Sequence, residues 1–307
     1  MDKPAVIGLV GPTAGGKTAL SLSLAAHHPI EVVCMDSMQV YRGMDIGTAK
    51  PTAAEQARIP HHMLDVADPA QPYSVAEYRE GALAAIQGIL DRGHMPVLVG
   101  GTGLYLRALS QGLTLGNTPR DDAVRGRYEA MLAAEGKQAL HDQLRRVDPV
   151  SADRLHINDT RRVIRALEVW AVTGEPFSAQ RVPEGQEPYR FLLYAPDWPR
   201  QALYQRIDSR VDQMLAQGLL DEVGNLLRRG LTADMQSMQG LGYKELVPCL
   251  TGQADIGEAV ALIKRRTRNY AKRQLTWFRP DGRIRWLAPE GMEEALPQQV
   301  RLDMEEK

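Results

Sequence analysis

Short apolar runs alternate with helical patterns along the first hundred residues. Three runs rich in Val and Ile, at residues 5–10, 31–35 and 96–99, are typical of buried parallel strands. The segment 74–92 begins with a Ser-Val-Ala-Glu capping box, carries an apolar stripe at helical spacing and is followed by Gly. Strands that alternate with helices predict an α/β fold, in which ligands bind at the carboxyl ends of a parallel sheet.

The pattern changes after about residue 115. Residues 117–187 are polar, rich in Arg and helical in pattern, and 182–188 (VPEGQEP) resembles a linker. A further strand is predicted at 191–195, followed by helical segments at 199–227 and 256–278. We therefore predict one sheet core built from residues 1–114 and 190–285, a helical insertion domain at 115–189, and an acidic tail at 286–307.

Composition narrows the class of protein without naming a partner. The 307 residues contain 44% apolar and 24% charged side chains, a net charge of −1 and two cysteines. Two cysteines supply neither a metal-ligand set nor a disulfide scaffold, and no apolar run is long enough to span a membrane. No secretion signal is present, so we expect a cytoplasmic protein. Nine basic residues against one acid between 264 and 285 indicate either a polyanion-binding helix or a solvated helix face.

A phosphate-binding loop follows the first predicted strand and opens a helical pattern. Residues 11–18 match G-x-x-x-x-G-K-[ST] in full. The loop residues are Gly11, Pro12, Thr13, Ala14, Gly15, Gly16, Lys17 and Thr18. Glycines let backbone N–H groups point inward, the helix N-terminus adds partial positive charge, Lys17 adds a full one, and the Thr18 hydroxyl can bind Mg²⁺. The loop therefore predicts a site for a di- or triphosphate with its metal.

The acids at the strand ends favour group transfer over hydrolysis. ATPases and GTPases use a strand-end carboxylate to help hold Mg²⁺. Here the strand at 96–99 runs into Gly-Gly-Thr-Gly, and Asp36 is the first acid at a strand end. The same carboxylate is compatible with a simpler role, as the cap of a helix that begins near Ser37.

Eight colinear blocks across residues 5–280 resemble tRNA dimethylallyltransferases, the bacterial tRNA isopentenyltransferase family. The blocks are GPTAGGKT (11–18), DSMQVYR (36–42), DIGTAKP (45–51), PHHMLD (60–65), GGTGLY (100–105), NDTRRVIRALE (158–168), GLGYKE (240–245) and YAKRQLTWFR (270–279). The phosphate loop alone is shared by many families, whereas the DSxQxY and C-terminal blocks are specific. Eukaryotic members add a zinc module, which two cysteines cannot build, so the bacterial form is indicated.

The resemblance implies a P-loop NTPase-like parallel sheet core with a helical insertion domain, and a specific reaction. A dimethylallyl group passes from dimethylallyl diphosphate to the exocyclic amine of the adenosine that follows the tRNA anticodon, giving N6-isopentenyladenosine. Lys17 and Mg²⁺ on Thr18 neutralise the leaving diphosphate, and Asp36 is the general-base candidate. Thr102 matches a residue at the reacting centre, although its Gly-Gly-Thr setting also fits a tight turn. Arg125 matches an arginine near the diphosphate or target nucleotide, and otherwise is one surface arginine among many.

The resemblance also implies the tRNA contacts. Candidate residues are Asp36, Ser37, Met38, Gln39, Arg161, Arg162, Val163, Ile164, Arg165, Gln239, Gly240, Leu241, Gly242, Tyr243 and Lys244. Arg161 and Arg165 share a helix face, with Ile164 and Leu167 expected toward a core. Basic positions 265, 268, 272 and 279 form a second ridge at helical spacing. Trp277 and Phe278 are predicted core anchors.

Two further function classes fit the phosphate loop. One is a P-loop small-molecule or nucleotide kinase, and the other is a nonenzymatic RNA-binding protein that uses the loop as a nucleotide switch. The loop chemistry is compatible with ATP as well as with dimethylallyl diphosphate. Adjacent His61 and His62 point to opposite faces of a strand and therefore chelate a metal poorly. We expect Mg²⁺ as cofactor, tRNA and dimethylallyl diphosphate as partners, no membrane association, and a monomer.

Overall fold

The computed structural model describes residues 3–110, 121–179 and 188–305. Contacts divide the chain into two compact units. The first comprises Met1–Leu106 and Pro188–Lys307, and the second comprises Arg107–Glu187. The predicted linker at 182–188 lies outside the described residues except for its last position. No helix in the described ranges is long and apolar enough to cross a membrane.

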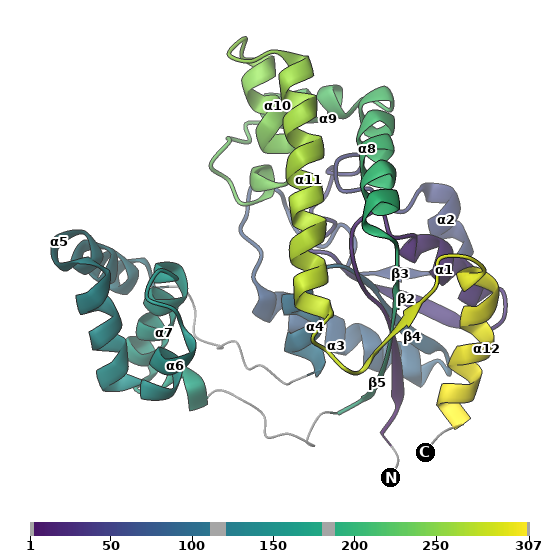
Figure 1. Ribbon diagram of the computed structural model, residues 1–307, viewed down its shortest axis with the longest axis horizontal. Helices are drawn as coiled ribbons and strands as arrows, with labels where there is room; N and C mark the ends of the chain where they lie inside the picture. Colours follow the sequence, from purple (N-terminus) through teal and green to yellow (C-terminus); the bar gives the residue numbers. More distant parts are fainter. Residues whose placement is uncertain (1–2, 111–120, 180–187, 306–307) are drawn as a thin grey trace. The chain divides into compact units, whose positions relative to one another are not determined.

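A six-stranded sheet forms the centre of the first unit, with strand order β3-β2-β4-β1-β5-β6 and every pairing parallel (Figure 1). The strands are β1 (Ala5–Leu9), β2 (Ile30–Met35), β3 (His61–His62), β4 (Met95–Gly100), β5 (Arg190–Pro196) and β6 (Ile284–Leu287). The predicted α/β class and the four strands expected from apolar runs are confirmed. The sequence pattern does not reveal β3 and β6, because two and four residues are too few to show a period.

Some helices of this unit pack against the sheet, and others pack against one another (Figure 1). They are α1 (Lys17–Ala25), α2 (Ala53–Arg58), α3 (Val75–Asp91), α4 (Gly103–Ser110), α8 (Arg200–Ala216), α9 (Leu219–Arg228), α10 (Tyr243–Leu250), α11 (Ile256–Phe278) and α12 (Met292–Glu305). The predicted capping box is present, since Ser74 accepts from the Glu77 amide and Glu77 accepts from the Ser74 amide. The helix predicted at 199–227 is two helices, because Gly218 adopts φ 98° between them.

Helix α12 lies within the predicted acidic tail and packs against the rest of the first unit, so the prediction of a separate tail is wrong. Helix α12 packs against α1, with Leu296 and Val300 fully buried in one cluster with Leu20 and Leu24. The Tyr194 hydroxyl on β5 also donates to Asp303 over 2.6 Å. The buried apolar residues Met292, Leu296 and Val300 recur at four-residue spacing, a helical pattern that the acidic composition of this segment does not show.

The second unit is a helical cluster with its own core. It contains α5 (Asp122–Val147), α6 (Pro149–Arg154), α7 (Thr160–Thr173) and the 3₁₀ turn η1 (Phe177–Ala179). Leu140 and Leu144 of α5 pack with Val163 and Leu167 of α7. Helix α5 is kinked at Gly136, which has φ 83° and ψ 179°. The helical character expected of this segment is present in its described part.

Candidate active site

The phosphate loop joins β1 to α1 and is braced from two helices. Gly11, Ala14 and Gly16 adopt positive φ of 116°, 59° and 95°, which curls the loop. Gln274 on α11 accepts from the Thr13 amide over 2.9 Å, and Arg206 on α8 donates to the Ala14 carbonyl over 2.8 Å. The predicted strand–loop–helix arrangement is therefore present, and helices far along the chain hold its shape.

Lys17 is folded over the loop. Its Nζ donates to the carbonyls of Gly11 (3.1 Å) and Pro12 (2.7 Å). Burial, and after it the charge of Arg210, lower the pKa of Lys17 to about 8, although the negative charge of Asp36 opposes both effects. A bound phosphate would restore the lysine's charge, because an anion beside a buried cation raises the cation's pKa.

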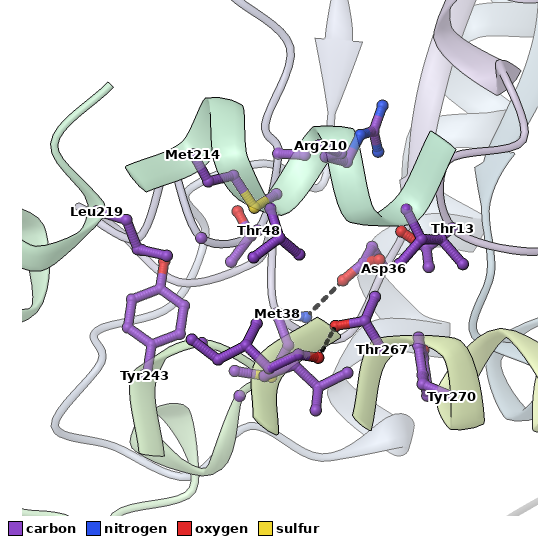
Figure 2. Close-up of a pocket in the computed structure, with 18 of the residues that line it drawn as sticks. Thr13, Asp36, Met38, Thr48, Arg210, Met214, Leu219, Tyr243, Thr267 and Tyr270 are labelled. Carbon is purple, nitrogen blue, oxygen red and sulfur yellow. Dashed lines mark hydrogen bonds between the residues drawn. The ribbon is translucent and has the colours of Figure 1, made fainter. Parts of the chain in front are cut away.

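Two cavities meet at the carboxyl end of the sheet. The P-loop cavity, of about 300 Å³, is lined by the phosphate loop together with Cys34, Gln39, Glu55, Gly101 and Arg206. The apolar cavity, of about 270 Å³, is lined by residues of α8, α10 and α11 that include Val211, Met214, Tyr243 and Ile263. Figure 2 shows Tyr243 and Leu219 on one side of the apolar cavity, opposite Thr13 and Asp36. Both cavities are lined by Thr13, Ala14, Asp36, Thr48, Ala49 and Arg210.

Asp36 stands on this shared wall, directly after β2. Its Oδ1 accepts from the amides of Met38 (2.9 Å) and Gln39 (3.4 Å), which forms a turn and not the first turn of a helix (Figure 2). The alternative of a helix cap is thus replaced by a turn cap. Burial raises the pKa of Asp36, against the lowering effects of the Met38 amide and of Lys17. Both bonds described for the carboxylate use Oδ1, so Oδ2 can serve a ligand.

Thr102 lies beside Asp36 because Gly100 lets β4 approach β2 and Gly101 leaves room for Gln274 of α11. A Cβ on Gly100 would lie 2.0 Å from the Met35 carbonyl oxygen, and one on Gly101 would lie 2.1 Å from Nε2 of Gln274. The Thr102 hydroxyl oxygen accepts from the Ser37 amide over 3.1 Å. The Gly-Gly-Thr segment therefore forms a tight turn and also places Thr102 next to the turn that begins at Asp36.

Comparisons with known proteins agree on one family. The chain matches the family model described as IPP transferase over residues 39–281, and the model described as isopentenyl transferase over residues 4–67. The chain belongs to the tRNA dimethylallyltransferase family. A protein named tRNA dimethylallyltransferase from Pelotomaculum thermopropionicum is 46% identical over 97% of this chain and 96% of its own length.

Solved structures support the same family. The tRNA isopentenylpyrophosphate transferase of Bacillus halodurans is 42% identical, with a TM-score of 0.74 over 99% of this chain and 98% of its own. A eukaryotic dimethylallyltransferase described as acting on tRNA is 30% identical, with a TM-score of 0.82 over 97% of this chain and 77% of its own. The predicted family, enzyme class and P-loop NTPase-like fold are confirmed.

In this member of the tRNA dimethylallyltransferase family, most predicted residues of the first unit gather around the apolar cavity. Its lining includes Ser37, Met38, Gln239, Gly240, Leu241, Gly242, Tyr243 and Lys244. Gln39 differs, because its side-chain amide donates to the carbonyls of Thr48 (2.9 Å) and Ala49 (3.1 Å). Its Oε1 accepts from the Cys34 thiol as well. Gln39 therefore supports the cavity wall.

In the second unit, the predicted contacts divide into exposed and buried side chains. Arg161 and Arg162 are exposed on α7. Val163 and Ile164 are buried in the unit's own core, which confirms the core position expected for Ile164 and leaves neither side chain exposed for tRNA. Arg125 donates to the fully buried Glu168 over 2.8 Å, and Arg165 pairs with the same carboxylate. This pairing gives Arg125 a structural task inside its unit.

The basic ridge predicted along α11 is smaller than expected. Arg268 donates to both carboxylate oxygens of Asp208 on α8, and Arg279 pairs with Asp197. Neutralised cations release fewer counterions on binding a polyanion. Arg265 and Lys272 are exposed. Phe278 is a core anchor as predicted, while Trp277 is half-buried against Gly103.

The two adjacent histidines lie at the edge of the sheet and have different partners. His61 bonds the Ile59 carbonyl, whereas His62 bonds Glu31 of β2 over 2.6 Å. Glu31 is buried and also accepts from Arg92 at 2.8 and 2.7 Å and from His94 at 2.9 Å. These donors, Arg92 foremost, lower the pKa of Glu31 to about 2. The cluster joins β2 to β3 and to the segment between α3 and β4.

Sequence reasoning missed several residues of the site. Arg206 and Arg210 of α8 line the P-loop cavity, and Gln274 of α11 joins the loop to the Gly101 carbonyl. Burial and the nearby Arg206 lower the pKa of Arg210. The helical pattern predicted at 199–227 gives no sign of these contacts, because they depend on how α8 packs against α11 and the phosphate loop. Gln274 lies within the YAKRQLTWFR block, and its place in this family-specific block is the one feature of the sequence that points to a role in the site.

Proposed function

We propose that this chain transfers a dimethylallyl group from dimethylallyl diphosphate to the exocyclic amine of the adenosine immediately 3′ of a tRNA anticodon, giving N6-isopentenyladenosine. The observation that carries the proposal is the position of Asp36, on the wall shared by a phosphate-binding cavity and an apolar cavity. A proton acceptor at such a junction can face the atom that leaves one substrate and the atom that joins the other.

The P-loop cavity fits the leaving diphosphate. Inward N–H groups of a curled loop, the N-terminus of α1 and the cations Lys17, Arg206 and Arg210 all face one space. Positive charge fixed in a buried site stabilises the negative charge that develops on the diphosphate as the allylic carbon–oxygen bond breaks. The loop therefore lowers the barrier by favouring the leaving group, and the low pKa of Lys17 is relieved when the anion binds.

The residues around Thr18 suit Mg²⁺. Thr18, Asp36 and Glu55 offer oxygen atoms to the same cavity, and oxygen is the ligand that Mg²⁺ prefers. The described ranges contain no group of three or more His, Cys, Asp or Glu side chains able to hold a metal ion unaided. Thr18 would therefore hold Mg²⁺ together with substrate oxygens and water. When bound, the ion would neutralise charge on the diphosphate.

Asp36 serves the acceptor, and Thr102 holds the turn beside it by accepting from the Ser37 amide. The adenine amine forms a bond to the allylic carbon, the diphosphate leaves with the electron pair of the broken carbon–oxygen bond, and the nitrogen loses a proton. Asp36 Oδ2 is the acceptor for that proton, while Oδ1 stays bonded to the Met38 amide. The raised pKa of Asp36 makes the carboxylate a stronger base than a solvated one.

The apolar cavity fits an extruded adenine and the alkyl group. It combines apolar walls at Val211, Met214 and Ile263 with polar atoms at Asp36 and Thr267. Enzymes that modify a base take it out of its stack into such a pocket. The exposed Arg161 of α7 supplies charge for the RNA backbone, whereas the neighbouring Arg162 is paired with Asp159 over 3.3 Å. The kinase alternative is not favoured, because both family models and the relatives describe transferases of an isopentenyl or dimethylallyl group.

The test is product analysis on an anticodon stem-loop. The protein is incubated with dimethylallyl diphosphate, Mg²⁺ and the RNA, which is then digested to nucleosides and analysed by mass spectrometry. We expect N6-isopentenyladenosine from the RNA with adenosine next to the anticodon, and none from a matched RNA with guanosine there, which lacks the exocyclic amine at that ring position. Unmodified adenosine in the first RNA would refute the proposal.

A further inference from the structure

Glu222, in the first turn of α9, accepts hydrogen bonds from the backbone of a distant loop, residues 45–49. Its Oε2 accepts from the amides of Asp45 (2.9 Å) and Ile46 (2.8 Å), and its Oε1 accepts from the amide of Gly47 (3.1 Å). Successive backbone N–H groups that point to one spot form an anion-binding site. Here the anion is a side chain of the protein itself, so the loop's shape depends on a carboxylate carried by another element.

The same carboxylate binds Tyr243, the first residue of α10. The Tyr243 hydroxyl donates to Glu222 Oε1 over 2.6 Å. The tyrosine ring also lies against Gly47, where an added Cβ would come within 2.5 Å of the ring. Tyr243 itself is fully buried. Its hydroxyl and ring therefore join the 239–244 segment to the loop that Glu222 holds.

This loop continues into the wall that the two cavities share. Thr48 and Ala49 line both cavities, and Gly47 lines the apolar one. Gln39 holds the far end of the loop through the carbonyls of Thr48 and Ala49. Ala49 adopts φ 51°, a conformation that a non-glycine residue keeps only when its surroundings hold it there.

We propose that Glu222 is a positioning residue for both substrates: it fixes the wall at residues 47–49 and links that wall to Tyr243 on the acceptor side. This inference rests on the proposed function, since it assigns one cavity to the donor and the other to the acceptor. Glu222 touches neither reacting atom. It acts by holding the wall in the shape that both substrates meet, so its loss weakens binding and spares the chemical step at saturation.

The variant Glu222→Gln removes the charge while keeping the size of the side chain. A carboxylate offers acceptor sites on two oxygens, whereas an amide keeps one acceptor oxygen and gains donors that face the loop's N–H groups. Hydrogen bonds to an ionised group are about twice as strong as neutral ones. We therefore expect KM for dimethylallyl diphosphate and KM for the stem-loop each to rise roughly 10-fold. We expect kcat to stay within about two-fold.

Asp221→Asn is the matched control. Asp221 is the exposed neighbour in the same helical turn, so this substitution removes the same charge without touching the loop. Its KM values should stay within about two-fold of the wild type. Tyr243→Phe should raise the stem-loop KM, and adding it to Glu222→Gln should raise that KM little further, because both variants break one contact. Thermal unfolding of each variant identifies the folded fraction.

The outcomes separate this inference from the proposed function. If the wild type makes no N6-isopentenyladenosine, the proposed function fails first. If the wild type is active and Glu222→Gln leaves both KM values unchanged, or lowers only kcat in proportion to lost folded protein, Glu222 is a structural residue and the inference is overturned. Independent, additive effects of Glu222→Gln and Tyr243→Phe on the stem-loop KM would overturn the link between them.

Discussion

Replacing Asp36 with asparagine separates the chemistry of this residue from its structural work. The carbonyl oxygen of the introduced asparagine can accept the Met38 amide as Oδ1 of Asp36 does at 2.9 Å, so the turn after β2 should survive. The amide cannot take a proton from the adenine amine. The substitution therefore removes the base and leaves the shape of the cavity junction.

The role of Asp36 as a general base sets the size of the expected effect on turnover. A positioned general base contributes about 10²–10⁴-fold to rate, so turnover should fall by that factor while stem-loop affinity stays near that of the wild type. A second effect acts on Lys17. The negative charge of Asp36 raises the pKa of Lys17, so its removal should shift the loss of Lys17 charge to lower pH. Asp36→Ala, which also removes the turn acceptor, should weaken RNA binding as well.

Single-turnover transfer with labelled donor, alongside equilibrium binding of the stem-loop, measures both quantities. Full activity of Asp36→Asn would remove this residue from the mechanism. Recovery of its rate as Mg²⁺ is raised would identify Asp36 as a metal ligand, because a missing base stays missing at any metal concentration. Loss of RNA binding equal to the loss of turnover would show that the turn, and not the proton, is what the carboxylate provides.

Three further predictions concern charge and packing. The kcat/KM for the donor should rise with pH as Asp36 ionises and fall above about pH 8 as Lys17 loses its proton. The variant Lys17→Arg keeps its charge at all these pH values, so it should be slower but show no alkaline fall. An alkaline fall that persists in Lys17→Arg would contradict the assignment of that fall to Lys17. Folding lowers the pKa of Glu31 from 4.5 to about 2, so the ionised carboxylate stabilises the folded state above about pH 4.5. This stabilisation is lost as the pH falls toward 2. Between pH 7 and pH 3 this contribution changes by about 2 kcal/mol, and Glu31→Gln should abolish that change in urea titrations at the two pH values. Gly100→Ala should cost roughly 3 kcal/mol or more, because its Cβ would meet the backbone of β2, whereas Gly126→Ala, with open space around it, should be neutral or stabilising by up to about 1 kcal/mol in thermal melts.

The parts of the site that lie in one continuous segment could be predicted from the sequence. The phosphate loop is eight consecutive residues, and Asp36 and Thr102 each follow a buried strand, so a parallel sheet brings them to one edge. The capping box of α3 is also local, since its partners are within one turn.

The remaining parts depend on packing between distant segments. Arg210 lines the cavities because α8 packs against α11 and the phosphate loop. The charge of Arg268 is neutralised by an ion pair with Asp208 on the neighbouring helix. Spacing within one helix shows which residues share a face and says nothing about the partner across from it. The burial of Val163 could have been predicted from the helical pattern, because Val163 lies next to the apolar stripe formed by Ile164 and Leu167 on α7.

The most direct test of the proposed reaction compares two donors. The protein and bulk tRNA are incubated with Mg²⁺ and either dimethylallyl diphosphate labelled in the allyl group or ATP labelled in the terminal phosphate, and label in the recovered RNA is counted. Transfer predicts label in RNA from the allyl donor alone, lost in Lys17→Ala while stem-loop binding remains. Phosphate label in RNA or in a small molecule, with no allyl label, would contradict the account.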